Sequence, residues 1–305
     1  MSRLRVGVDV GGTKILAGAV DATGRVVARA RVATPAGADA LSGAIAEAVG
    51  ALGIGAGAPI GVAIAGRVSR DGRTLVQAAN LGLADVPVAD LVERRLSTAT
   101  RLVNDADAAM WAECRVGAAR GCADAVMVAV GTGVGGSAVT GGRLVTGAHG
   151  GAGEIGHMVV KRDGRRCTCG GRGCLDQYGS GRALWRHARR GYRHLRIDPP
   201  ADLGAAADAG DAVALAAYDR IGRWLGAGIA DVAALLDPER IVLAGGIAAS
   251  THAFAETVDR HLRDELHRRG VAAVPSVVRA ELGADAGMIG AADLSLGDTR
   301  REDAA

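Results

Sequence analysis

Four residues in the middle of the chain have the types and the spacing of a metal site. His157 is followed by three thiols, at Cys167, Cys169 and Cys174. Sets of four thiolate and imidazole ligands are those that tetrahedral zinc takes in structural sites. The pattern predicts a structural zinc site completed by His157, with free or redox-active thiols as the alternative. Four protein ligands leave no open coordination position, which argues against a zinc-dependent hydrolase.

Two carboxylates flank this cluster. Glu154 stands three residues before His157, and Asp176 stands two residues after Cys174. A metal loop would hold both acids rigidly around one polar pocket, where ionised carboxylates could accept hydrogen bonds from the hydroxyls of a sugar. Surface acids on a glycine-rich loop are the alternative.

Three glycine-rich turns could approach phosphate groups, because glycine lets backbone amides come close to a ligand. They are Asp9-Val-Gly11-Gly12-Thr13-Lys14, Gly131-Thr132-Gly133-Val134-Gly135-Gly136 and Gly245-Gly246-Ile247. The second lacks the Gly-Lys-Ser/Thr ending of a Walker loop and the following helix of a dinucleotide-binding fold. Asp9 could order magnesium through water, and Thr13 or Lys14 could meet a terminal phosphate. A plain β-hairpin turn is the alternative for the first.

A further acid, Asp105, follows an expected strand and begins an expected helix together with Asn104. The helix dipole favours the ionised form of a carboxylate at this place, which suits Asp105 to accept a proton from a hydroxyl. Asp107, on the next turn, is a rival and is expected to be structural. The alternative is that one of these residues only caps the helix.

Short valine-rich strands and alanine-rich helices must position these residues. We expect strands at 4–10, 15–20, 25–32, 59–65, 101–103, 124–130, 134–140 and 240–244. We expect helices at about 38–52, 87–96, 104–116, 181–192, 211–235, 250–268 and 287–296. The strand–turn–strand units around Gly11 and Gly131 look like two copies of one structural motif. The last helix should pack back on the first lobe, and the tail after Gly297 should be disordered.

Composition limits the class of protein. The 305 residues are 49% hydrophobic, which is enough for a large core in two lobes. The net charge of +3 and the scattered basic residues argue against a nucleic-acid surface. No apolar run approaches the roughly 18 residues of a membrane span and no signal peptide is visible, so we expect a cytoplasmic protein. Cys114 and Cys122 lie outside the cluster and are expected to be core thiols.

The five motifs that begin at Asp9, Asn104, Gly131, Glu154 and Cys167 resemble, in the same order, those of the ROK family of bacterial sugar kinases, and in particular its glucokinases. The resemblance covers nearly the whole chain. It implies an α/β protein with the actin-like ATPase (ribonuclease H-like) fold, two lobes and a cleft between them. The small N-terminal lobe would comprise 1–118 plus 289–305, and the large C-terminal lobe with the zinc loop would comprise 119–288.

The resemblance also implies an ATP-dependent kinase that phosphorylates a hexose such as glucose, usually at the 6-hydroxyl, with Mg²⁺ and a structural Zn²⁺. Asp105 would be the catalytic base. Residues implied around the sugar are Gly66, Asn104, Asp105, Glu154, His157 and Asp176. Residues implied around ATP are Asp9, Gly11, Gly12, Thr13, Lys14, Thr132, Gly133, Gly245 and Gly246. His157 would bind zinc through one ring nitrogen while the other faces the sugar.

Two departures from the family pattern concern the substrate. The family usually has Glu at the position of Asp176, and a side chain shorter by one methylene reaches different hydrogen-bond partners. The segment 78–83 lacks the Pro-Asn and Trp common in glucokinases. Another hexose, an amino sugar or a sugar-like cyclitol is therefore an alternative substrate. A non-catalytic sugar sensor is a further alternative, although a sensor would not need both Asp105 and the phosphate turns. No nucleic-acid or membrane partner is expected, and family habit implies a homodimer or homotetramer.

Overall fold

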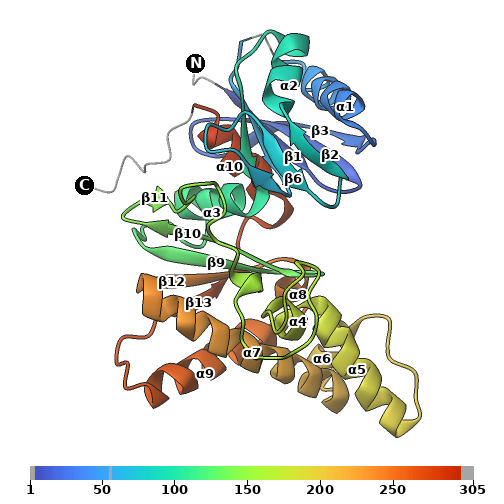
Figure 1. Ribbon diagram of the computed structural model, residues 1–305, viewed down its shortest axis with the longest axis vertical. Coiled ribbons are helices and arrows are strands. Elements are labelled where there is room, and N and C mark those ends of the chain that lie inside the picture. The colour runs from blue at the N-terminus through green and yellow to red at the C-terminus, as the bar shows by residue number, and fades with distance from the viewer. Residues whose placement is uncertain (1–3, 55–56, 297–305) are drawn as a thin grey trace. The chain divides into compact units, whose positions relative to one another are not determined.

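The computed structural model describes residues 4–54 and 57–296 (Figure 1). Contacts divide these residues into two compact units. Unit 1 takes in the described residues of Met1–Gly121, Gly141–Ala152 and Glu281–Ala305, and unit 2 comprises Cys122–Thr140 and Gly153–Ala280. The lobe boundaries expected at 118/119 and 288/289 stay a prediction, and the tail after Gly297 lies outside the described residues.

Unit 1 contains a five-stranded sheet with the order β3-β2-β1-β4-β8. Its elements are β1 (Arg5–Val10), β2 (Lys14–Val20), β3 (Val26–Ala33), α1 (Ala38–Gly50), β4 (Ile60–Ile64), β5 (Arg67–Val68), β6 (Leu75–Ala78), β7 (Leu83–Val86), α2 (Val88–Leu96), β8 (Thr100–Asn104), α3 (Asp105–Val116), β11 (Arg143–Leu144), η2 (Gly283–Asp285) and α10 (Ala286–Leu294). The strands β1, β2 and β3 are antiparallel neighbours, whereas β1, β4 and β8 run parallel. The carboxyl ends of β1, β4 and β8 therefore meet at one edge of the sheet.

Helices cover the sheet of unit 1, with α1 and α2 packed together (Figure 1). The C-terminal helix α10 packs on β1, β4 and α3, so the last helix does return to the first part of the chain, as expected. Its backbone lies directly on the sheet. A Cβ atom added to Gly61 of β4 would stand 1.7 Å from the carbonyl oxygen of Ala291, so only glycine permits this approach.

A second, three-stranded sheet with the order β5-β6-β7 also belongs to unit 1. The sequence did not predict it. Its strands have two to four residues, which is too short for the alternation of buried and exposed side chains to stand out.

Unit 2 repeats part of this plan. Its elements are β9 (Ala125–Val130), β10 (Val134–Thr140), η1 (Ile155–His157), α4 (Asp176–Gly179), α5 (Gly181–Leu195), α6 (Leu203–Asp208), α7 (Ala212–Leu236), β12 (Arg240–Ala244), α8 (Gly246–Ala249), α9 (Ala253–Arg268) and β13 (Ser276–Arg279). The strand β9 pairs antiparallel with β10 and parallel with β12, as β1 does with β2 and β4. The two predicted strand–turn–strand units are therefore related in topology.

The long helix α7 forms the centre of the helical layer of unit 2, with α9, α5, α6 and α4 packed against it (Figure 1). It runs from Ala212 to Leu236, one residue beyond the predicted range at its C-terminal end. Asp211 caps its first turn by accepting a hydrogen bond from the Ala214 backbone N–H at 2.8 Å. The short elements α4, α6, α8 and β13 were not predicted.

Candidate active site and metal centre

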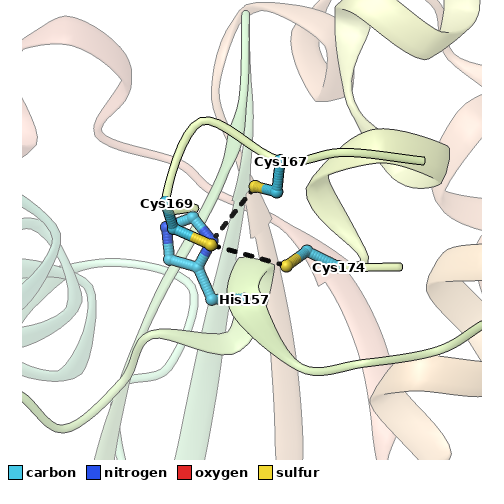
Figure 2. Close-up of side chains that lie close together, drawn as sticks. All are labelled: His157, Cys167, Cys169 and Cys174. Atoms are coloured by element: carbon cyan, nitrogen blue, oxygen red, sulfur yellow. Dashed lines mark hydrogen bonds between the residues drawn. The ribbon is translucent and has the colours of Figure 1, made fainter. Parts of the chain in front are cut away.

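The side chains of His157, Cys167, Cys169 and Cys174 converge, as Figure 2 shows, with their ligand atoms all within 4.8 Å of one another. Cys167 Sγ lies 3.6 Å from His157 Nδ1, and Cys169 Sγ lies 3.7 Å from Cys174 Sγ. A zinc ion with Zn–S of about 2.3 Å and Zn–N of about 2.0 Å would separate its tetrahedral ligands by roughly 3.5–3.8 Å. The donor set and its spacing fit zinc.

The thiols of this cluster shift one another's pKa values. Burial alone would raise the pKa of Cys167, but hydrogen bonds from Cys169, Cys174 and His157 outweigh it and lower that pKa to about 7. Burial and the neighbouring thiols raise the pKa of Cys174 to about 12. Three thiolates this close repel one another unless a cation lies between them, and zinc would supply that charge.

The other ring nitrogen of His157 faces an acid. Nε2 lies 3.9 Å from Oε2 of Glu154, and both side chains are partly exposed. Nδ1 is directed at the cluster, so Nε2 of His157 and the carboxylate of Glu154 are the polar groups that this part of the loop presents to solvent. This is the arrangement expected if one nitrogen binds metal and the other meets a polar ligand.

Asp176 differs from Glu154 in being almost fully buried, with 4% of its surface exposed. Its Oδ1 accepts a hydrogen bond from the Val134 backbone N–H at 2.9 Å. Its Oδ2 accepts from the Arg182 guanidinium at 2.7 Å and from Gln177 Nε2 at 3.0 Å. Asp176 thus joins the metal loop to the glycine turn of β9–β10, and its contact with a sugar stays a prediction.

In unit 1, Asn104 is the N-cap of α3. Its Oδ1 accepts hydrogen bonds from the backbone N–H groups of Ala106 and Asp107, at 2.9 and 3.1 Å. Its Nδ2 donates to the Gly66 carbonyl at 3.0 Å, which leaves one N–H of the amide for another partner. The capping role considered from the sequence therefore belongs to Asn104, and Asp105 is the first residue of the helix.

Asp9 lies near Asp105, since β1 and β8 end at the same edge of the sheet. Burial, and next the charge of Asp105, raise the pKa of Asp9 to about 6 against the opposing effect of Lys14. The turn that follows is a tight hairpin in which the Gly11 N–H donates to the Lys14 carbonyl at 3.0 Å. Two acids and one lysine therefore gather at the carboxyl ends of these strands.

The second glycine turn, at 131–133, is closed by a hydrogen bond of 2.9 Å from the Gly131 N–H to the Gly133 carbonyl. A Cβ atom at Gly133 would stand 2.7 Å from Asp176 Oδ1, so the buried acid requires glycine there. Gly245 has a positive φ of 89° and directly precedes the short helix α8, which begins at Gly246. Thr132 lines a hollow of about 1070 Å³, together with Gly131 and Ile247.

The hollow also contains a feature that the sequence analysis missed. Its remaining lining comes from α5 and the residues after it, and most of these side chains are arginine. The basic residues were expected to be scattered, but the helical spacing of the α5 arginines could have shown that they share one face.

A family model described as ROK family matches residues 5–297. The chain belongs to the ROK family. The glucokinase of Streptomyces coelicolor is 35% identical over 308 residues, covering 96% of this chain and 97% of that protein. The N-acetylmannosamine kinase of Escherichia coli is 33% identical over 296 residues, covering 95% and 98%.

Structural comparison agrees with this membership. The crystal structure of a ROK glucokinase from Streptomyces griseus in complex with glucose and AMPPNP has a TM-score of 0.84 with this chain at 37% identity, covering 97% of this chain and all of that one. The predicted α/β actin-like ATPase fold is confirmed. In the described part of this ROK chain, no helix is long and apolar enough to span a membrane.

Proposed function

We propose that the chain transfers the γ-phosphoryl group of ATP to a hydroxyl of a hexose, with glucose as the first candidate and the 6-hydroxyl as the acceptor. The ROK chain is an ATP-dependent sugar kinase, an activity supported by its full-length likeness to glucokinases. One structural observation carries the detailed proposal. The parallel strands β1 and β8 bring Asp9 and Asp105 to one sheet edge, where two neighbouring carboxylates can take different roles.

Asp105 is assigned the general base. It stands at the first position of α3, where the helix dipole favours a carboxylate, and Asn104 holds the start of that helix. In the proposed reaction, Asp105 accepts the proton of the attacking hydroxyl. The other sugar hydroxyls are assigned to Gly66, Asn104, Glu154, His157 and Asp176.

Asp9 is assigned to the donor side. Bound Mg²⁺ would neutralise charge on the transferring phosphates, and Asp9 would hold it through water. The residues assigned to the phosphates are Gly11, Gly12, Thr13, Lys14, Thr132 and Gly133, and those assigned to the nucleoside are Gly245 and Gly246. The zinc cluster is assigned a structural role, which is to fix the ring of His157.

The identity of the sugar is less constrained than the reaction. Asp176 accepts three internal hydrogen bonds and is buried, so its oxygens reach a sugar only if one of these partners gives way. A relative that is an N-acetylmannosamine kinase makes an N-acetylated or amino sugar the second candidate, and a cyclitol the third. A cytoplasmic location and a homodimer or homotetramer also belong to this proposal.

The test is a screen for ADP release with ATP, Mg²⁺ and single sugars. Glucose, mannose, allose, N-acetylmannosamine, glucosamine and inositol cover the candidate classes. We expect one of them to give a turnover of about 1–10³ per second, with the phosphate at the 6-position by NMR. Sugar binding without any ADP release would instead support the non-catalytic sensor.

A further inference from the structure

One fully buried acid takes no part in the proposed proton transfer or in binding the reactants. The Glu113 side chain stands near the C-terminal end of α3 and has no exposed surface. Asp176 is the other buried acid among the described residues, and it belongs to unit 2. A buried carboxylate is costly unless donors satisfy its oxygens, so the partners of Glu113 indicate its role.

The Glu113 carboxylate accepts three hydrogen bonds from the backbone. Its Oε2 accepts from the N–H groups of Ala118, at 2.7 Å, and Glu281, at 3.2 Å. Its Oε1 accepts from the N–H group of Leu282 at 2.9 Å. One side chain therefore holds together two stretches of backbone that lie far apart in the sequence.

These two stretches lie where the chain first leaves unit 1 and where it finally returns. The first segment of unit 1 ends at Gly121, shortly after Ala118, and its last segment begins at Glu281. The carboxylate thus ties the outgoing chain to the returning chain on the unit 1 side of both passages. The fit is close, because a Cβ atom added to Gly117 would stand 2.2 Å from Glu113 Oε2.

Helix α3 connects this tie to the proposed base. Asp105 begins the helix, and Glu113 stands eight positions further on, about 12 Å along the axis. The helix packs on α10 (Figure 1). The two backbones touch, since a Cβ atom added to Gly290 would stand 1.7 Å from the Ala108 carbonyl oxygen. A displacement at Glu113 would therefore move α3 as one body and reach Asp105.

The returning chain connects the same tie to the second acid of the proposed site. Leu282 leads through η2 directly into α10. A Cβ atom added to Gly287, in the first turn of α10, would stand 3.2 Å from Asp9 Cγ, so this end of the helix lies against the Asp9 side chain. Glu113 thus reaches Asp105 through α3 and Asp9 through the start of α10.

We propose that Glu113 is a positioning residue for the phosphoryl transfer, which holds the two chain passages so that Asp105 and Asp9 keep their relative places at the sheet edge. This inference rests on the proposed function. The two acids act on opposite reactants, Asp105 on the hydroxyl and Asp9 on the donor side, so their relative position decides the in-line geometry. A purely structural role, in which Glu113 only satisfies three buried N–H groups, is the alternative.

Two substitutions displace the carboxylate independently. Glu113→Gln leaves one side-chain oxygen for three N–H groups and directs an amide NH₂ at the remaining donor. Gly117→Ala keeps Glu113 but places a methyl group where Oε2 lies. Gly117 has a negative φ of −123°, so this substitution requires no left-handed backbone.

Both variants should lower kcat by about 10–10²-fold, since a misplacement of about 1 Å at reacting groups has an effect of this size. They should also raise the Mg²⁺ concentration needed for half-maximal activity, because Asp9 is displaced. The Kd of the sugar should change little, since most of its hydroxyls are assigned to residues outside α3. This division between turnover and sugar binding is what a positioning role predicts.

Ile45→Ala is the control for lost stability. Ile45 is fully buried on α1, which packs on β2, β3 and α2, so the substitution should destabilise the fold by leaving a cavity. With every protein assayed well below its unfolding temperature, Ile45→Ala should keep the kcat and the Mg²⁺ requirement of wild type. A purely structural role predicts the same result for the variants of Glu113 and Gly117.

Hydrogen exchange and calorimetry separate failure of this inference from failure of the proposed function. The amides of Ala118, Glu281 and Leu282 should exchange at least about tenfold faster in both variants than in wild type. Mg²⁺–AMPPNP should bind both variants more weakly, even in a preparation that phosphorylates no sugar. Wild type without any kinase activity would refute the proposed function, and these two measurements would still decide the role of Glu113.

Three results would overturn the inference. The first is faster exchange of the three amides with kcat, Mg²⁺ requirement and Mg²⁺–AMPPNP affinity all at wild-type values. The second is unchanged protection of these amides in both variants, which would mean that the carboxylate does not hold the two passages. The third is an equal loss of kcat in Ile45→Ala, which would assign the effect to stability.

Discussion

Asp176 Oδ1 and the backbone N–H of Val134 form a hydrogen bond of 2.9 Å across 42 positions of sequence. The same carboxylate pairs with Arg182 at 2.7 Å. One buried acid therefore connects the segment after the last cysteine of the cluster, the glycine turn before β10 and the first turn of α5. In the proposed enzyme the first segment serves the sugar and the second serves the phosphates, while the third lines the hollow beside Thr132. Asp176 therefore couples the positions of all three.

This coupling predicts different effects for two substitutions of Asp176. Asp176→Ala leaves the Val134 N–H and Arg182 without their acceptor and should cost about 1–3 kcal/mol of unfolding free energy. It should also raise KM for both sugar and ATP. Asp176→Asn keeps an acceptor for Val134 and should be milder in stability. Urea unfolding and steady-state kinetics measure the two effects, and an alanine variant with wild-type stability and KM contradicts the coupling.

Removal of the proposed base should act on turnover. Asp105→Asn should lower kcat by about 10²–10⁴-fold, the usual contribution of general base catalysis, while sugar binding measured by calorimetry persists. Asp107→Asn is the matched control, because Asp107 is an acid on the same helical turn that is assigned no role in proton transfer. A near-normal kcat in the Asp105 variant, or equal losses in the two variants, would remove Asp105 from the mechanism.

The carboxylate of Asp9 should make the protein without bound Mg²⁺ less stable at neutral pH than at pH 4. Its folded-state pKa of about 6 lies above the ordinary value of 3.8, so the folded state binds the proton more tightly than the unfolded state. Stability therefore falls as the pH rises from about 4 to about 6. Above that range the cost is fully present, about 3 kcal/mol from the shift of roughly two pKa units.

The substitution Asp9→Asn tests this account. Without Mg²⁺ it should stabilise the protein at pH 7 by up to about 3 kcal/mol, with the gain vanishing below pH 4. The same substitution should strongly reduce ATP-dependent turnover. Urea unfolding of both proteins at pH 4 and pH 7 measures the difference, and a gain that does not depend on pH would argue against a titrating Asp9.

Local patterns predicted more of this protein than long-range ones. The hairpin strands β1–β2 and β9–β10 follow from alternating valines around glycine turns, and the cysteine cluster follows from ligands close together in sequence. The partners of Asp176 could not be predicted, since they depend on how distant segments pack. The short sheet β5-β6-β7 was missed because its strands carry too few residues for a period. The arginines along α5 were not predicted, because the composition of the chain does not show which residues share one face of a helix.

Loss of the metal should lower the stability of the fold, and activity should fall as a consequence of that lost structure. We expect about one zinc per chain by metal analysis, and Cys169→Ser should lower that content and the unfolding temperature together. Cys122→Ala, at a buried thiol outside the cluster, is the control and should keep the metal. A strong chelator should inactivate slowly, in step with lost structure. Rapid inactivation with intact structure would point to a catalytic metal.

The close packing of α10 on β4 predicts that a larger residue at Gly61 destabilises the protein. Gly61→Ala would place a methyl group 1.7 Å from the Ala291 carbonyl oxygen, inside backbone that cannot move as a flexible side chain would. The helix must then shift, and we expect a loss of about 1–3 kcal/mol or more, as for overpacked cores. Gly50→Ala is the matched control, because it ends α1 with nothing within 4 Å of the added atom. That change should be neutral or stabilise by up to about 1 kcal/mol, the usual difference between glycine and alanine in a helix. Thermal and urea unfolding distinguish the two, and equal effects would mean that α10 does not rest on the sheet through its backbone.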